Sequence, residues 1–184
     1  RKHKMKLGIE NHKDWRADEL VSVLKQLDSE WLGVTLDFGN SISLLENPME
    51  VVEKLAPYSV SAHIKDMAVD EYQNGFLLAE VPMGKGILDL KKMVDICLKH
   101  NQKIKFNLEM ITRDPLEIPC ISADYWPSME GIPALDLANT LKMVKDKKVK
   151  TPIQKISVLT DEEKLGQEEK NIVDSFSFAK SLGL

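Results

Sequence analysis

The six residues LGVTLD, Leu32–Asp37, decide the fold of this chain. Their apolar and polar side chains alternate strictly, which is typical of a β-strand with one apolar and one polar face. A helical pattern with Pro48 in its first turn follows at 48–55. The stretch therefore predicts one strand-helix unit whose strand ends in the carboxylate of Asp37.

Three further segments repeat this pattern of a strand that ends in a polar group. They cover residues 4–10, 59–63 and 103–109 and end in Glu10, His63 and Glu109. In the third of the four strands, Val60 and Ala62 are expected on the apolar face. Helices are predicted over 17–27, 48–55, 88–99 and 133–145. Strands that alternate with helices form parallel sheets, so the fold class is α/β.

The polar face of each strand distinguishes between two α/β architectures. Sheets with helices on both sides have strands that are apolar on both faces. A barrel has helices on its outside only, and its narrow interior accepts small and polar side chains such as Gly33 and Thr35. We therefore predict a (β/α)8 TIM barrel. Because a complete barrel takes about 250 residues, we expect this chain to carry the second half, with the first half in preceding residues rather than in a partner chain.

The intervals between the strand ends predict the domain organisation. The interval after His63 is longer than the first two, so residues 67–86 are expected to be an insertion, with an extra strand or a further barrel strand at 76–81. The Pro-containing stretch 113–133 is expected to be irregular and to cover a site. We expect residues 1–150 to form the half-barrel with its metal site and residues 151–184 to form a terminal helical extension packed on it.

Composition and charge exclude several classes of protein. With 25 Lys+Arg and 29 Asp+Glu the net charge is −4, which does not favour nucleic acid or a membrane surface as a partner. No apolar run reaches the roughly 18 to 20 residues that cross a bilayer, so we expect a cytoplasmic protein. Cys97 and Cys120 form no C-x-x-C motif, which argues against a disulfide framework and against a thiolate zinc site.

The four strand ends together predict a metal site. Glu10, Asp37, His63 and Glu109 each end the inward face of a strand, so they should meet at one level of the barrel mouth. Singly, each Glu or Asp is more readily explained as a helix cap, and the His as a structural residue. Together, three carboxylates and one imidazole would repel one another unless a cation lay among them. Such ligands suit one divalent ion, and Mn²⁺, Mg²⁺, Co²⁺ and Zn²⁺ all remain candidates.

Four short motifs resemble those of a known family. They are IENH at 9–12, LDFGN at 36–40, HIKD at 63–66 and LEM at 108–110. They resemble the metal-site motifs of the xylose-isomerase-like barrel superfamily, in particular its sugar phosphate isomerase/epimerase branch, over the chain up to about residue 145. The resemblance implies that Glu10, Asp37, His63 and Glu109 bind one divalent metal, and that Glu10 and Glu109 are the catalytic proton-transferring pair.

Substrate contacts are predicted beside these ligands. The resemblance implies that His12, Asn40 and Lys65 are substrate-binding residues. Asn40 stands where the ketohexose epimerases of the group commonly have a His, and the Arg that follows their His ligand has no counterpart here. Arg113 follows the last strand closely enough to bind substrate or, alternatively, to form a salt bridge in its loop.

The expected function is that of a divalent-metal-dependent sugar or sugar phosphate isomerase/epimerase. Its chemistry begins when a carboxylate removes a proton next to a metal-polarised carbonyl. Return of the proton to the adjoining carbon gives isomerisation, and return to the same carbon from the opposite face gives epimerisation. The same abstraction begins a keto-sugar dehydratase or lyase reaction. The expected partner is a small-molecule carbohydrate, and a homo-oligomer is left open.

Other functions are alternatives to a sugar isomerase/epimerase. An endonuclease-IV-like phosphodiesterase needs a zinc cluster with several histidines, whereas this acidic chain has four in all. The Gly84-Lys85-Gly86 segment is either a phosphate-binding loop or a turn. A catalytically degenerate sugar-binding barrel and a stable α/β fragment without activity are the non-enzyme alternatives.

Overall fold

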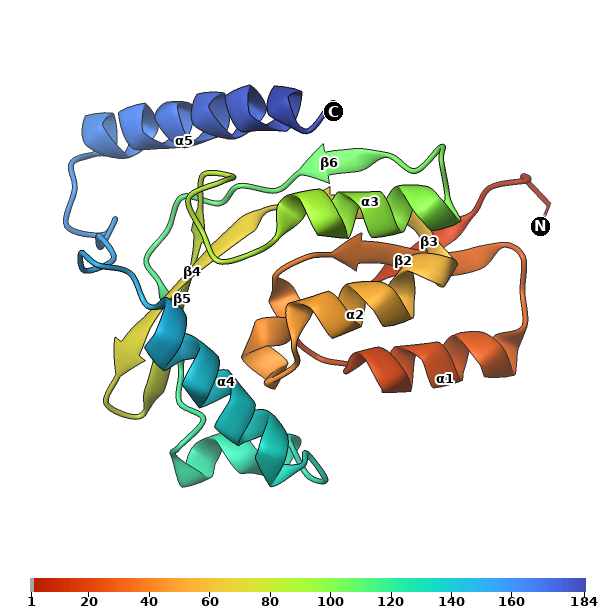
Figure 1. Cartoon of the computed structure of the whole chain (residues 1–184), viewed down its shortest axis with the longest axis horizontal. Helices are drawn as coiled ribbons and strands as arrows, with labels where there is room; N and C mark the ends of the chain where they lie inside the picture. The colour runs from red at the N-terminus through yellow and green to blue at the C-terminus, as the bar shows by residue number, and fades with distance from the viewer. Residues whose placement is uncertain (1) are drawn as a thin grey trace. The chain divides into compact units, whose positions relative to one another are not determined.

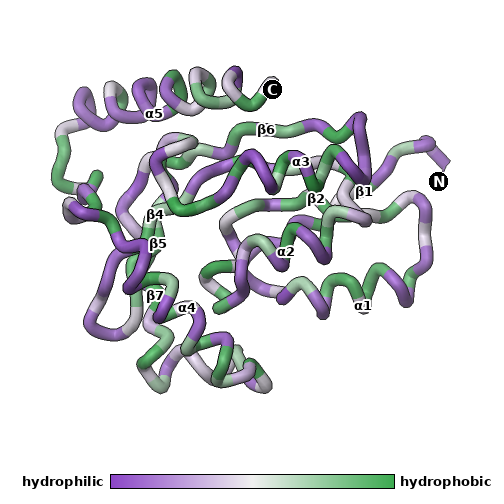
Figure 2. Tube along the Cα trace, in the orientation of Figure 1, coloured by the Kyte–Doolittle hydropathy of each residue, from purple (hydrophilic) through white to green (hydrophobic). Residues whose placement is uncertain are grey.

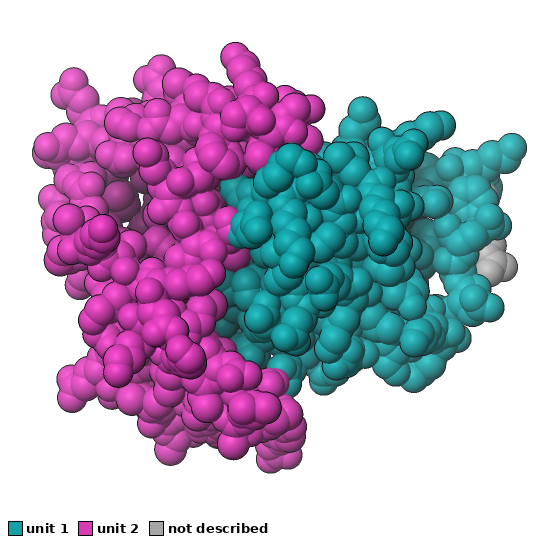
Figure 3. All heavy atoms as spheres, in the orientation of Figure 1, with its two compact units in different colours: residues 1–64, 89–109 teal, residues 65–88, 110–184 magenta. Residues whose placement is uncertain are grey.

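The computed structural model describes residues 2–184, which form two compact units. The first unit comprises the described residues 2–64 and 89–109, and the second comprises residues 65–88 and 110–184 (Figure 3). The chain therefore leaves the first unit after Ile64, returns at Asp89 and leaves it again after Glu109. These boundaries differ from the division expected near residue 150, which stays a prediction.

A parallel sheet of four strands organises the first unit. Its order is β1 (Leu7–Glu10), β2 (Leu32–Asp37), β3 (Ser59–Ile64) and β6 (Phe106–Leu108). Three helices, α1 (Ala17–Leu27), α2 (Pro48–Leu55) and α3 (Leu90–His100), lie side by side along the strands (Figure 1). This is the βα repeat predicted from the sequence, and the bounds predicted for α1 and α2 are confirmed.

Apolar side chains between these helices and the strands form the core of the first unit. They come from each of the three helices and from the central strands, and all are at most 6% exposed: Leu20, Leu24, Val34, Leu36, Val52, Leu55, Ala62, Met93 and Cys97.

Polar side chains set the starts of helices α1 and α2. Asn47 accepts hydrogen bonds from the backbone N–H of Met49 and Glu50 at the start of α2, while the carboxylate of Glu46 accepts the N–H of Ala17 at the start of α1.

The opposite face of the sheet carries small and polar side chains. The hydroxyl oxygens of Thr35 and Ser61 lie 2.9 Å apart, and a Cβ on Gly8 would overlap the hydroxyl oxygen of Thr35. Val60 also belongs to this face, which corrects the sequence prediction. The register of β2 and β3 shifts after Val34, and this bulge places Val60 so close to Gly33 that a Cβ there would lie 2.7 Å from its Cγ1.

An antiparallel sheet organises the second unit. Strands β4 (Asp66–Tyr72) and β5 (Gly75–Val81) form a hairpin, and β7 (Leu116–Ile118) pairs with β5. The strand expected at 76–81 is therefore an extra strand rather than a barrel strand. The segment expected to be irregular contains β7 and the 3₁₀ helix η3 (Ala123–Ser128).

Two helices complete the second unit. Helix α4 (Ala134–Lys147) packs on the hairpin and buries Val144, and α5 (Asp161–Ser181) is the terminal helix expected from the sequence. The first half of α5 is mostly hydrophilic (Figure 2). Ser175 in its second half accepts the N–H of Met83, and Asn171 donates to the hydroxyl of Thr112. Within residues 2–184, no helix has the length and apolar character needed to cross a membrane.

Candidate metal centre

The four predicted ligands lie together at one edge of the parallel sheet in the first unit. Glu10 ends β1, Asp37 ends β2, His63 is the penultimate residue of β3, and Glu109 follows β6 directly. Parallel pairing aligns Asp37 with His63, and the N–H of Glu109 donates to the carbonyl of Ile64. One ligand atom from each of the four side chains lies within 4.8 Å of all the others.

The imidazole lies between the two glutamates. Nδ1 of His63 is 3.0 Å from Oε2 of Glu109 and 3.7 Å from Oε1 of Glu10. The side chains of these three residues are 26–31% exposed, whereas Asp37 is only 1% exposed. Asp37 therefore lies deepest, and the two glutamates and the imidazole border the solvent-accessible side of the cluster.

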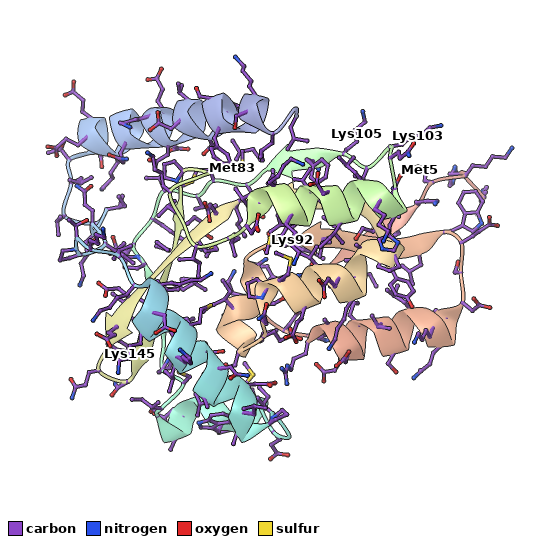
Figure 4. The ribbon with its side chains drawn as sticks, viewed as in Figure 1. Met5, Met83, Lys92, Lys103, Lys105 and Lys145 are labelled. Carbon is purple, nitrogen blue, oxygen red and sulfur yellow. The ribbon has the colours of Figure 1, made fainter. Side chains whose placement is uncertain are left out.

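Lys103 and Lys105, at the start of the strand predicted over residues 103–109, lie away from this cluster (Figure 4). Lys103 and Lys105 precede β6, at the amino ends of the strands, where Met5 also lies (Figure 4). The cluster is at the carboxyl ends. These two lysines therefore do not balance the charge of the carboxylates.

The geometry and the donor types fit a divalent ion. Ligand bonds of about 2.0 to 2.2 Å place opposite ligands roughly 4.0 to 4.4 Å apart, so atoms within 4.8 Å need to move only slightly. Three carboxylate donors and one imidazole form a hard oxygen-rich set. Three carboxylates this close also repel one another unless a cation or a protonated imidazole compensates their charge.

A buried asparagine holds the main chain at Asp37. Nδ2 of Asn11 donates to the carbonyl oxygen of Asp37 at 2.9 Å, and Oδ1 of Asn11 accepts the N–H of Asp37 at 2.7 Å. Oδ1 of Asp37 itself accepts the backbone N–H groups of Gly39 and Asn40 at 2.9 and 2.7 Å. Sequence reasoning did not single out Asn11, although it directly follows a predicted ligand.

Asn40, predicted to bind substrate, contacts a predicted ligand. Its Nδ2 donates to Oε1 of Glu10 at 3.1 Å, and its Oδ1 accepts a hydrogen bond from Nζ of Lys13 at 2.8 Å. Asn40 is 1% exposed. Lys13 was also missed by sequence reasoning, because its contact with Asn40 joins residues far apart in the chain.

The other predicted substrate contacts are His12, Lys65 and Arg113. His12 is exposed in the first unit, and Lys65 is 1% exposed in the second unit. Arg113 also belongs to the second unit, where its Nη2 and Nε lie 2.7 and 3.2 Å from the carboxylate oxygens of Glu80. Of the two roles considered for Arg113, the structure shows a salt bridge, and its partner is on β5. Substrate contacts by these residues stay predictions.

The glycine segment 84–86 is a turn closed by a carboxylate. The backbone N–H groups of Gly84, Gly86 and Leu88 donate to Asp66 at 3.0, 2.8 and 3.2 Å. Burial raises the pKa of Asp66, and these hydrogen bonds oppose that shift. Because the amides that would bind a phosphate already have an acceptor, the observed contacts favour the turn.

Two curated proteins share part of the sequence. The chain is 35% identical over 89 residues to a 3-oxo-isoapionate decarboxylase of Pectobacterium atrosepticum, which covers 47% of this chain and 32% of that protein. It is 33% identical over 92 residues to YihM, an uncharacterized protein of Escherichia coli K12, which covers 49% of this chain and 28% of that protein. The matches thus span about a third of each relative.

Solved structures share the fold. A xylose isomerase-like TIM barrel protein from Mycobacterium smegmatis in complex with magnesium has a TM-score of 0.52 at 22% identity, over 74% of this chain and 45% of that one. A xylose isomerase domain protein from Planctomyces limnophilus has a TM-score of 0.51 at 20% identity, over 79% of this chain and 48% of that one. The xylose isomerase-like TIM barrel family model matches residues 1–151. The chain belongs to the xylose isomerase-like TIM barrel family.

Proposed function

We propose that this chain carries the metal-binding and proton-transferring part of a divalent-metal-dependent sugar isomerase or epimerase. The observation that carries the proposal is the convergence of Glu10, Asp37, His63 and Glu109 from four strands to within 4.8 Å. Membership of the family and the magnesium in one structural relative support the same reading.

The four side chains have different tasks in this proposal. All four would hold the ion, which when bound supplies positive charge that stabilises negative charge developing on a substrate oxygen. Asp37 is buried, and two backbone N–H groups fix one of its oxygens, so it is suited to a permanent ligand. Glu10 and Glu109 are longer and partly exposed, so they are the carboxylates that can reach a substrate C–H.

Two glutamates on different strands allow two outcomes. Glu109 removes a proton from the carbon next to the carbonyl and becomes a carboxylic acid. If Glu109 returns the proton to the adjoining carbon, the product is the aldose or ketose isomer. If Glu10 delivers a proton to the original carbon from the other face, the product is the epimer.

A decarboxylase is the second candidate. The curated relative that shares 35% identity over 89 residues is named for the decarboxylation of a 3-oxo sugar acid. Loss of CO₂ from such an acid leaves the bonding electrons as an enolate, and a protonated Glu10 or Glu109 would then supply the proton that completes the product. Dehydration of a keto-sugar would begin with the same proton abstraction as isomerisation.

An exchange experiment tests the proposal without knowledge of the natural substrate. The full protein is incubated in deuterated water with Mn²⁺ and a panel of keto-sugars and 3-oxo sugar acids, with NMR for deuterium incorporation and a CO₂ assay. We expect deuterium next to the carbonyl of at least one compound, and a loss of about 10²-fold or more in Glu109→Gln. Glu117→Gln, an exposed change on β7, is the matched control.

The outcomes separate the candidates. Deuterium exchange without CO₂ release supports an isomerase or epimerase, and CO₂ release supports the decarboxylase. If Glu109→Gln and Glu10→Gln both kept full activity on a confirmed substrate, the catalytic roles would be wrong. If the wild-type protein bound no divalent metal, a degenerate sugar-binding barrel would replace the enzyme reading.

A further inference from the structure

Two buried asparagines, Asn11 and Asn40, link the end of β1 to the end of β2. Asn11 is 0% exposed and Asn40 is 1% exposed, whereas the glutamate ligands beside them are partly open to solvent. We propose that both are positioning residues that hold Glu10 and Asp37 at the spacing that one divalent ion requires. This inference rests on the proposed metal site and assigns Asn40 a role other than the substrate contact expected from sequence.

Asn11 extends the strand pairing beyond the point where the backbone ladder ends. The last paired residues of β1 and β2 are Glu10 and Thr35. Beyond them, the side-chain amide of Asn11 offers one donor and one acceptor, as a peptide group does, and bonds both main-chain polar atoms of Asp37. Asp37 is thereby fixed relative to the residue that follows Glu10.

Asn40 joins the side chains of the same two ligands. Its backbone N–H donates to Oδ1 of Asp37, and its side-chain Nδ2 donates to Oε1 of Glu10. The orientation of the amide is determined by its neighbours, because Lys13 can only donate a hydrogen bond and an ionised Glu10 can only accept one. Each carboxylate therefore has one oxygen tied to the same residue.

These hydrogen bonds matter because the ligands repel one another before an ion arrives. Three carboxylates whose atoms lie within 4.8 Å would separate if their side chains were unrestrained. The hydrogen bonds of Asn11 and Asn40 keep the ligands together, so binding an ion requires less rearrangement of the side chains. All of these hydrogen bonds join residues of the first unit.

Asn101 offers a matched control in the same unit. Like the side chain of Asn40, its side chain makes two hydrogen bonds: Nδ2 donates to the carbonyl of Ser59 at 3.3 Å, and Oδ1 accepts the N–H of Lys103 at 3.1 Å. Ser59 begins β3, so these contacts lie at the opposite end of the strand from His63. Replacing Asn101 should lower stability without disturbing the ligands.

The test measures Mn²⁺ binding and stability separately. The full protein and its Asn11→Ala, Asn40→Ala and Asn101→Ala variants are titrated with Mn²⁺ by calorimetry, the Mn²⁺ electron paramagnetic resonance spectrum is recorded, and Tm is measured without metal. We expect Kd to rise about 10- to 100-fold in Asn11→Ala and in Asn40→Ala, the usual effect of losing a partner of a metal ligand. Asn101→Ala should keep the wild-type Kd and spectrum while its Tm falls.

Each outcome decides the inference. If the wild-type protein binds Mn²⁺ and both ligand-side variants keep its Kd, the asparagines have only a structural role and the inference is wrong, while the proposed function stands. If the wild-type protein binds no Mn²⁺, the proposed function and the inference are both overturned. If Asn11→Ala does not fold, Asn40→Ala decides alone, since its backbone hydrogen bond to Asp37 is retained.

Discussion

In the first unit, Glu10 and Glu109 approach the same imidazole nitrogen of His63, whereas in the second unit Glu80 faces the guanidinium of Arg113. Asp66 in the second unit likewise accepts backbone N–H groups. Acids that face donors stabilise the fold. Acids that face one another need something more to balance their charge, and this difference is the reason why we propose a metal site at the strand ends.

The largest expected effect comes from breaking the cluster of the first unit. Replacing His63 with Ala removes one of four predicted ligands. Since structural metal sites can be worth about 10 to 16 kcal/mol, losing one ligand should weaken Mn²⁺ binding on the order of 10²-fold or more. His100→Ala, an exposed change at the end of α3, is the control. Calorimetric titrations that gave equal affinities for both variants would remove His63 from the site.

The salt bridge of the second unit should show the opposite pattern. Arg113→Ala leaves the carboxylate of Glu80, whose side chain is 2% exposed, without its guanidinium partner. We expect a loss of about 2 to 4 kcal/mol in the free energy of unfolding, measured in urea, with unchanged Mn²⁺ affinity. Glu80→Leu in the same background should recover part of the loss. A large change in Mn²⁺ affinity would instead connect this salt bridge to the metal site.

The buried thiols allow a pH test with one cysteine in each unit. Burial raises the pKa of Cys97 from 9.0 to about 12. Because the folded pKa is raised, the stability that this thiol contributes is complete below pH 9 and is lost as pH rises from 9 towards 12. We expect a loss of about 1 kcal/mol in unfolding free energy between pH 9 and pH 10. Cys97→Ala should flatten this slope, as measured by urea unfolding across the pH range.

Cys120→Ala is the comparison variant for the second unit. Burial also raises the pKa of the Cys120 thiol. The alkaline slope of unfolding should therefore contain separate contributions from Cys97 and Cys120. A slope that neither substitution changed would show that these thiols do not govern alkaline stability.

The smallest expected effect concerns the backbone amides of Ile156 and Ser157, which donate hydrogen bonds to Asp114. Hydrogen bonds from Ser157, together with the N–H of Ile156, lower the pKa of the partly exposed Asp114 carboxyl. Because the folded pKa is lowered, the stabilisation is present above the ordinary value and is lost as pH falls through the lowered one. Hydrogen exchange should show protection of the Ile156 and Ser157 amides at neutral pH that Asp114→Asn reduces. Equal protection in both proteins would contradict this role.

Local patterns explain why much of the first unit could be predicted. The helix bounds 17–27 and 48–55 follow from apolar periodicity and from signals at the helix ends such as Pro48. The polar ends of the strands follow from strict alternation, and parallel pairing then brings them to one edge. The convergence of Glu10, Asp37, His63 and Glu109 was therefore predictable, although their roles stay proposals.

The features that sequence reasoning missed depend on contacts between distant residues. The bulge that moves Val60 to the other face changes the pairing with β2 and leaves no local signature. Whether 76–81 joined a barrel or a hairpin depended on its pairing with β4. The roles of Asn11 and Lys13 became visible only when their side chains met Asp37 and Asn40.

The most direct test of the central claim is a crystal structure of the protein soaked with Mn²⁺, with anomalous diffraction to locate the ion. The proposed site predicts one strong peak within roughly 2.0 to 2.2 Å of oxygens from Glu10, Asp37 and Glu109 and of a ring nitrogen of His63. A protein that bound Mn²⁺ only elsewhere, or showed no peak among these four side chains at saturating Mn²⁺, would contradict the claim that they form a metal centre.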